Sequence, residues 1–231
     1  MYTILKKEVL NPTVTRMVID APFVAKRAKA GQFIILRVNE EGERIPLTIA
    51  DSDSEKGTVS IIFQIVGKTT MLLNTLEEGD SLHDFVGPLG KPSEIDGNEK
   101  VCIIGGGVGC AIAYPTAKAF HEAGSDVTTI VGFRNKDLVI LEDEFKECSD
   151  AYYLMSDDGS VGQKGVVTLK LEELIQSGEK FDKVIAIGPI IMMKFVCELT
   201  KKYNIPTVVS MNPIMIDGTG MCGGCRLRVG D

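Results

Sequence analysis

The pattern of hydrophobic residues changes near residue 90, and this change constrains the fold more than any other feature of the sequence. Before it, short runs rich in β-branched residues alternate with turns, over residues 13–20, 32–39, 44–50 and 57–66. One helix-length stretch, residues 69–80, interrupts them. Short strands at this spacing are typical of an antiparallel barrel or sandwich.

The second half of the chain has a different pattern of hydrophobic residues. After a stretch rich in Gly and Pro over residues 87–100, which we interpret as a linker, apolar strands alternate with helix-length segments. This alternation predicts a parallel sheet covered on both faces. From about residue 210 a glycine-rich appendage fits neither pattern. We therefore predict three parts, residues 1–96, 97–209 and 210–231. The strands expected in the second part span residues 101–106, 126–133, 151–156, 183–188 and 206–210.

Composition narrows the class of protein. With 231 residues, 44% of them hydrophobic, the chain can bury sizeable cores, and its net charge of −7 argues against a nucleic-acid surface. No apolar run is long enough to span a bilayer, and the first residues lack the apolar region of a signal peptide. The six cysteines are irregularly spaced, which does not suggest a disulfide framework. We expect a reduced, cytoplasmic protein.

A glycine turn in the second part predicts nucleotide binding. The segment "VCIIGGGVGC" reads as a buried strand that ends in glycines before a helix, where backbone N–H groups can meet phosphates. Gly105 and Gly107 fit G-x-G-x-x-G, but Cys110 takes the third position. Arg134 stands where a ribose-binding acid is expected, so the choice between NAD and NADP stays open. The alternative is a tight turn without a ligand, although the loops at 156–165 and 188–193 also follow strands.

The first part offers two candidate anion contacts. Arg44 is flanked by apolar strand residues, and a buried strand keeps an arginine only where an anion meets it. The "GKTT" at 67–70 lacks the glycine that a phosphate loop needs at Ile62, which excludes that class of ATPase. A glycine turn that opens a helix can still hold a diphosphate. Taken alone, however, the sequence favours Thr69 or Thr70 as a helix cap.

Seven motifs in this order resemble the ferredoxin–NADP reductase superfamily over nearly the whole chain. They are "AGQFIILRV", "RIPLTIA", "VGKTT", "GPLG", "IIGGGVG", "SDDGSVGQKG" and "GPIIMM". The ending, "MNPIMIDGTGMCGGCR", is similar to the iron–sulfur branch of that superfamily. This branch includes the small subunits of electron-bifurcating NADH-dependent ferredoxin:NADP oxidoreductases and the electron-transfer subunits of dihydroorotate dehydrogenase B.

The resemblance implies an FAD-binding barrel followed by an NAD-binding domain. Arg44 would meet the FAD phosphates, with the strand after it along the isoalloxazine and ribityl. The expected FAD residues are Arg44, Pro46, Leu47, Thr48, Gln64, Gly67, Thr69 and Thr70. The expected NAD residues are Gly105, Gly106, Gly107, Gly109, Arg134, Asp157, Asp158, Gly188, Pro189 and Met192.

The C-terminal stretch "DGTGMCGGC" predicts a [2Fe–2S] site. Asp217, Cys222 and Cys225 reproduce the plant-type C-x₄-C-x₂-C spacing with the first ligand changed to oxygen. The resemblance implies that the aspartate is a ligand, and the fourth ligand is expected beyond Asp231, in a truncated part of the chain. A zinc knuckle would need a second cysteine pair or a histidine pair, and neither follows. A glycine turn with spare thiols is the alternative.

The resemblance implies an oxidoreductase subunit that moves electrons between NAD(H) and a larger redox subunit through FAD and the cluster. That partner would be of the ferredoxin:NADP oxidoreductase beta type, or a dihydroorotate dehydrogenase catalytic subunit. A non-catalytic sensor of NADH is a further alternative. Hydride transfer between bound cofactors needs orientation more than an acid or base, so we assign no catalytic side chain, and neither His83 nor His121 a role. Cys102, Cys110 and Cys197 are expected to pack, and Cys148 to be superficial or half-buried.

Overall fold

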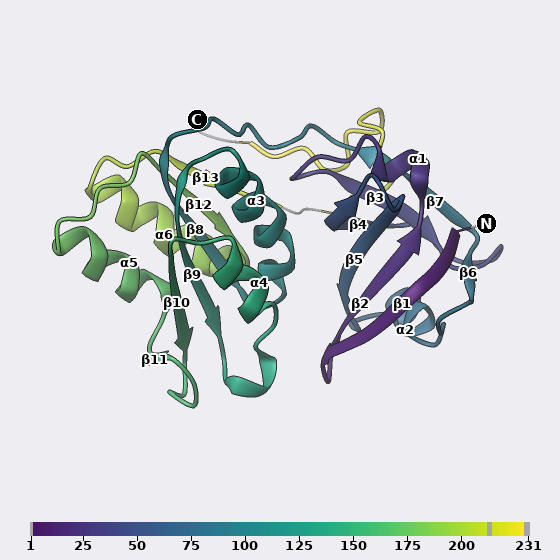
Figure 1. Ribbon diagram of the computed structural model, residues 1–231, viewed down its shortest axis with the longest axis horizontal. Helices are drawn as coiled ribbons and strands as arrows, with labels where there is room; N and C mark the ends of the chain where they lie inside the picture. The colour runs from purple at the N-terminus through teal and green to yellow at the C-terminus, as the bar shows by residue number, and fades with distance from the viewer. Residues whose placement is uncertain (1, 212–213, 229–231) are drawn as a thin grey trace. The chain divides into compact units, whose positions relative to one another are not determined.

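The computed structural model describes residues 2–211 and 214–228 (Figure 1). The chain divides into two compact units. One contains the chain up to Ser93 together with the residues from Met211 onward, and the other contains Glu94–Ser210. The boundaries we set from sequence at 96/97 and 209/210 stay predictions. Within the described residues, no helix is both long enough and apolar enough to cross a membrane.

The first unit is an antiparallel sheet that curls into a nearly closed barrel (Figure 1). Its seven strands follow the order β6-β1-β2-β5-β4-β3-β7. The interior is filled by apolar side chains such as Met17, Ile34, Ile61 and Phe85. The elements are β1 (Tyr2–Asn11), β2 (Val14–Asp20), α1 (Pro22–Ala25), β3 (Phe33–Arg37), β4 (Ile45–Asp53), β5 (Thr58–Gln64), α2 (Lys68–Asn74), β6 (Ser81–Leu82) and β7 (Asp84–Leu89).

Three of these strands were not expected from the sequence. In β1, register shifts at Ile4/Lys6 and Val9/Asn11 break the alternation of apolar residues that reveals a strand. The two-residue β6 is too short to leave a pattern. Strand β7 contains Gly87 and Pro88, which we assigned to a linker; proline is tolerated there because β7 is at the edge of the sheet. The expected helix at 69–80 is wrong in extent, since α2 ends at Asn74.

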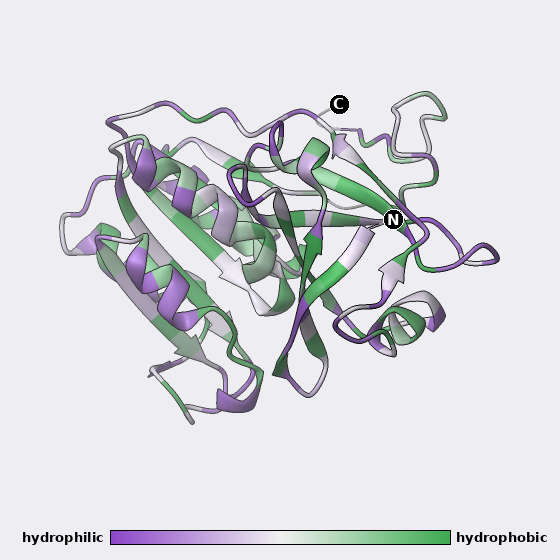
Figure 2. Cartoon of the chain, turned by 45° about the vertical axis from the view of Figure 1, so that its right-hand side comes forward, coloured by the Kyte–Doolittle hydropathy of each residue, from purple (hydrophilic) through white to green (hydrophobic). Residues whose placement is uncertain are grey.

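The second unit is a parallel sheet with helices on both faces, as predicted (Figure 1). Its strand order is β11-β10-β9-β8-β12-β13. Figure 2 shows hydrophobic residues concentrated in the strands, while the helices of this unit carry hydrophilic residues on one side. The elements are β8 (Lys100–Gly106), η1 (Gly107–Gly109), α3 (Cys110–Glu122), β9 (Asp126–Phe133), η2 (Lys136–Leu138), α4 (Glu142–Glu147), β10 (Ala151–Ser156), β11 (Gln163–Lys164), α5 (Val167–Gln176), β12 (Lys183–Ile187), α6 (Ile190–Lys202) and β13 (Thr207–Val209).

The cysteines of this unit are mostly core residues. Cys102 and Cys110 are fully buried, as expected, and burial raises the pKa of both thiols well above its ordinary value. Cys148 was expected to be superficial or half-buried, and that expectation is wrong: it is only 5% exposed, and burial raises its thiol pKa to about 11. All six cysteines of the chain are free thiols.

Candidate functional site

The residues expected to contact FAD meet at one end of the barrel. Strands β4 and β5 are antiparallel neighbours, so the beginning of β4 and the end of β5 at Gln64 lie at the same end of the sheet. Helix α2 starts four residues after Gln64. A hydrogen bond from Thr69 Oγ1 to Glu43 Oε2, 3.3 Å long, connects the start of α2 to the loop before β4. This hydrogen bond therefore brings together two segments whose contacting residues are 26 positions apart in the sequence.

Alternation along β4 separates the expected flavin strand into two faces. Ile45 and Leu47 pack against the barrel core. Since successive side chains of a strand point to opposite faces, Pro46 and Thr48 lie on the outer face. Of the three residues expected along the flavin, Leu47 is thus partly buried against the core, and Pro46 and Thr48 lie on the opposite face of the strand.

The first turn of α2 is capped by a side chain, and the backbone at Gly67 is not covered by neighbouring atoms. The Thr70 hydroxyl oxygen accepts hydrogen bonds from the N–H groups of Val66 and Gly67, at 3.0 and 3.1 Å, so Thr70 caps the helix as the alternative interpretation expected. A Cβ atom added to Gly67 would meet nothing within 4 Å. The space beside the Gly67 backbone is therefore open.

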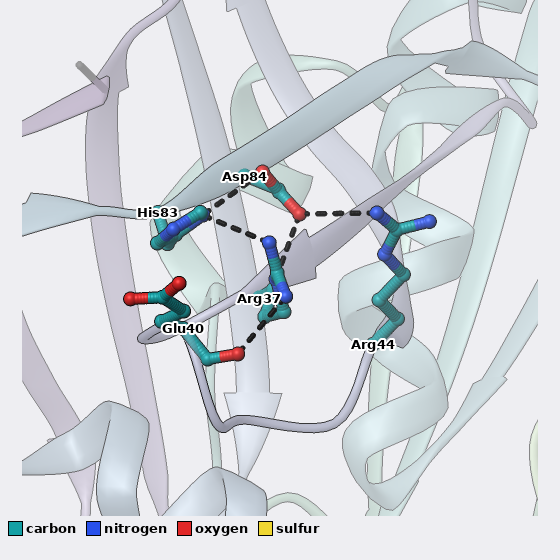
Figure 3. A network of polar contacts seen from close by, with 5 residues as sticks. All are labelled: Arg37, Glu40, Arg44, His83 and Asp84. Atoms are coloured by element: carbon teal, nitrogen blue, oxygen red, sulfur yellow. Dashed lines mark hydrogen bonds and ion pairs between the residues drawn. The ribbon is translucent and has the colours of Figure 1, made fainter.

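Arg44 belongs to a charged network around Asp84 (Figure 3). Asp84 Oδ2 accepts from Arg37 Nε at 2.8 Å and from Arg44 Nη2 at 3.3 Å, and Asp84 Oδ1 lies 3.1 Å from His83 Nδ1. Our premise that Arg44 is buried is wrong, because it precedes β4 and its side chain is 62% exposed. One contact to Asp84 leaves most of its N–H donors free for an anion.

The side chains of Arg37, His83 and Asp84 belong to this network, and the sequence analysis gave none of them a role. Arg37 ends β3 and Asp84 begins β7, and the two are paired across the strands. Arg37 also donates to Glu40 O at 3.0 Å and lies 3.1 Å from His83 Nδ1. Hydrogen bonds from His83 and then Arg37 hold the pKa of Asp84 below its ordinary value of 3.8, against the opposing effect of partial burial. No local pattern marks these residues, because 47 positions separate Arg37 from Asp84.

In the second unit, the expected NAD-binding glycines mainly allow two turns to pack closely. A Cβ atom on Gly109 would lie 2.7 Å from Gly188 Cα, and one on Gly188 would lie 3.1 Å from Gly106 Cα. Gly105 is packed against Cys110 Sγ in the same way, at 2.8 Å. Gly107 differs: its φ is +54° and the space beyond it is open to 4 Å. Gly107 is thus the position in this turn where a ligand can approach the backbone.

The other expected NAD residues cluster at the carboxyl ends of the parallel strands. Arg134 follows β9, and Asp157 and Asp158 follow the neighbouring β10. The Asp158 N–H donates to Arg134 O at 3.3 Å, which joins the two loops, and Ser160 holds the pKa of Asp158 below its ordinary value by hydrogen bonding. Pro189 and Met192 begin α6, and Met192 packs towards Gly106 and Gly188. Ligands of open α/β sheets bind at this edge.

The C-terminal loop holds the expected cluster ligands, but it does not gather them into a metal site. Asp217 Oδ1 accepts from Thr219 N at 2.8 Å, and Oδ2 accepts from Cys222 N at 3.0 Å. These bonds lower the pKa of Asp217, that from Thr219 most. Gly224 N–H points to Cys222 Sγ at 3.4 Å, the kind of contact expected for a sulfur ligand. Across residues 2–211 and 214–228, however, no three His, Cys, Asp or Glu side chains converge as metal ligands.

Comparison with known proteins agrees with the two-unit architecture. Residues 2–93, the barrel, match the oxidoreductase FAD-binding domain family. The chain is 50% identical over 226 residues to a dihydroorotate dehydrogenase B (NAD(+)) electron transfer subunit homolog of Thermotoga maritima, covering 98% of this chain and 79% of that protein. It is 33% identical to the dihydroorotate dehydrogenase B (NAD(+)) electron transfer subunit of Streptococcus pneumoniae R6, covering 98% and 88%.

A solved structure supports the same relationship. One chain of the NADH-dependent reduced ferredoxin–NADP oxidoreductase, determined in a study of flavin-based electron bifurcation, superposes with a TM-score of 0.90 at 49% identity. The alignment covers 98% of this chain and 81% of that chain.

The network at Asp84 predicts a pH-dependent contribution to stability. Because the folded pKa of Asp84 is below the ordinary 3.8, its ion pairs contribute fully above that pH and are lost as the pH falls through the folded value. Asp84→Asn should lower the free energy of unfolding by about 1 kcal/mol at pH 7, and the difference from wild type should shrink below pH 3.8. Urea unfolding of both proteins at each pH measures this.

Asp20→Asn provides the control, since Asp20 is an exposed carboxylate at the end of β2. Its difference from wild type should remain small at both pH values. A difference for Asp84→Asn that stays constant between pH 7 and pH 3 would show that the network contributes no charge-dependent stability.

Proposed function

Because this chain belongs to the FAD-binding oxidoreductases of the ferredoxin reductase superfamily, close to the dihydroorotate dehydrogenase B electron-transfer subunits, we propose that it transfers electrons between NAD(H) and a larger redox subunit. The cofactors proposed are FAD, bound by the barrel, and a [2Fe–2S] cluster in the C-terminal loop. The observation that carries the proposal is the FAD-binding family match, whose residues 2–93 form the barrel where the expected flavin contacts meet.

The barrel residues fit a flavin. Arg44 presents an exposed guanidinium for the FAD phosphates, and charge-assisted hydrogen bonds to phosphate are strong. Gly67 leaves space for the pyrophosphate at the start of α2, beside Thr69. Pro46 and Thr48 offer the outer face of β4 to the isoalloxazine and ribityl. When bound, FAD accepts a hydride and can release electrons singly, so this chain need only bind, orient and shield its cofactors.

In the second unit, Gly107 and the loops at 134 and 157–158 are the proposed nucleotide contacts. Asp157 and Asp158 lie in the loop next to that of Arg134 at the sheet edge. The two carboxylates would repel a 2′-phosphate, whereas the arginine would attract it. We propose NADH as the donor because the dihydroorotate dehydrogenase B relatives are named for NAD(+). Transfer needs the nicotinamide to be held against the flavin with water excluded.

The donor set of the C-terminal loop has the chemistry of an iron–sulfur site, with two thiols and one carboxylate. Binding iron would require Asp217 to use a lone pair not engaged by Thr219 or Cys222, or to give up one of those hydrogen bonds. The proposed partner is a larger subunit, of the ferredoxin:NADP oxidoreductase beta type as in electron bifurcation, or a dihydroorotate dehydrogenase catalytic subunit. The free thiols favour a cytoplasmic location.

Steady-state oxidation of NADH with a dye acceptor tests the function. The purified protein should reduce the dye rapidly, with a higher kcat/KM for NADH than for NADPH. Slow oxidation of both donors by a flavin-loaded protein would favour the alternative, a non-catalytic NADH sensor. A clear preference for NADPH would instead assign Arg134 to the 2′-phosphate and overturn the choice of NADH.

The role of Arg44 is tested by flavin retention. Arg44→Ala should remove a contact worth roughly 1.5–3 kcal/mol, which is about a 10- to 150-fold increase in the Kd for FAD. Dilution followed by flavin fluorescence measures the loss. Lys56→Ala is the matched control, because Lys56 is a 78% exposed cation in the turn at the opposite end of β4 and β5. Equal retention by the two variants would remove Arg44 from the site.

The role of Asp217 is tested by two substitutions in protein purified anaerobically. Asp217→Cys should keep a [2Fe–2S] cluster but change its EPR g-values and midpoint potential, because a thiolate donates more strongly to iron than a carboxylate does. Asp217→Ala should make the cluster labile. If both variants have the wild-type spectrum and potential, Asp217 is not a ligand and only its bonds to the glycine turn remain.

A further inference from the structure

The outer face of β3 contains a side chain that is buried without belonging to the barrel core. Ile34 and Leu36 point inward and are fully buried in the core. Ile35 lies between them and so points outward, yet it is only 6% exposed and is not a member of that core cluster. Its cross-strand neighbour on β7, Val86, is 51% exposed. Something other than the barrel interior therefore covers Ile35.

The C-terminal loop is what covers it. A Cβ atom added to Gly218 would overlap Ile35 Cδ1 and would lie 3.3 Å from Phe33 Cε2. Gly218 has a φ of +71°, so this position needs glycine both for its backbone and for its close approach to β3. The opposite edge of the Phe33 ring lies against Gly90, whose added Cβ would be 2.8 Å from Cε1. The Phe33 ring is thus held between two glycines from distant parts of the chain.

The part of the loop beyond Gly218 is ordered by its own hydrogen bonds. Asp217 binds the N–H groups of Thr219 and Cys222 with its two oxygens, at 2.8 and 3.0 Å. We call the loop from Asp217 to Cys225 the cysteine loop. Its own hydrogen bonds hold it together, and it contacts β3 at Gly218.

We propose that Phe33 and Ile35 form the docking surface for the cysteine loop, and that this contact fixes the loop beside the flavin-binding strand. Phe33 is paired with Thr48, and Ile35 with Pro46, on the neighbouring strand β4. Side chains directly opposite each other on paired strands share a face. The cysteine loop therefore docks on the face that carries Pro46 and Thr48. The functional meaning of this placement rests on the proposed function, but the docking contact does not.

Two glycines in the loop allow a matched test. Gly218 and Gly220 both have positive φ, +71° and +86°, so valine strains the backbone at either position. Only Gly218 faces β3, whereas the space beyond Gly220 is open to 4 Å. Hydrogen exchange of the peptide containing Thr219 and Cys222, read by mass spectrometry on the whole protein, should be about tenfold faster in Gly218→Val than in Gly220→Val, because undocking opens the loop.

A second pair tests the surface itself. Ile35→Ala removes the covered side chain and Val86→Ala removes its exposed neighbour, and neither side chain is a member of the barrel's core cluster. Only Ile35→Ala should accelerate hydrogen exchange in the cysteine loop. If Gly218→Val does not fold, the comparison of Ile35→Ala with Val86→Ala tests the docking surface by itself. Equal exchange within either pair would overturn the docking surface. The dye assay with NADH is run separately, so a protein with a protected loop but no NADH oxidation would contradict the proposed function and leave the docking contact standing.

Discussion

The two-sidedness of β3 and β4 is the constraint on which the candidate site depends. Ile34 and Leu36 point inward and are buried in the barrel core, and the partly buried Ile45 and Leu47 pack against that core. Because side chains alternate along a strand, the same packing forces Phe33, Ile35, Pro46 and Thr48 outward. A slip of one residue in this register would move the outer set into the core. The hydrophobic core thus determines which residues are offered to a flavin and which to the cysteine loop.

Charge is organised around a single carboxylate at one end of the same strands. Asp84 contacts Arg37, Arg44 and His83, and without this carboxylate the two arginines would repel each other. His83 Nδ1 lies near both Arg37 and Asp84, and one nitrogen cannot accept from the first while donating to the second. The network positions Arg44 without burying it, so its charge stays available to a ligand.

Glycine has two different uses in this chain. In the second unit, Gly106, Gly109 and Gly188 let the turns after β8 and β12 approach each other more closely than any side chain allows. Gly107, Gly67 and Gly220 face open space instead. A glycine-rich motif therefore does not by itself identify ligand contacts, because most of its members can be needed for packing between neighbouring turns.

The sequence by itself determined the fold class and the order of the units, because the patterns that indicate them are local. Short β-branched runs between turns predicted β2 to β5, and the alternation of strands with helix-length segments predicted the parallel sheet. The sequence also singled out Arg44, the glycine turns and the Asp217–Cys225 loop by residue type and spacing. Only the tertiary structure decided that Arg44 is exposed, that Leu47 packs against the core, and that Arg37, His83 and Asp84 meet. It alone placed Gly218 against Ile35, 183 positions away by residue number. The reason is physical: these outcomes depend on strand pairing and burial between distant segments, which no local pattern records.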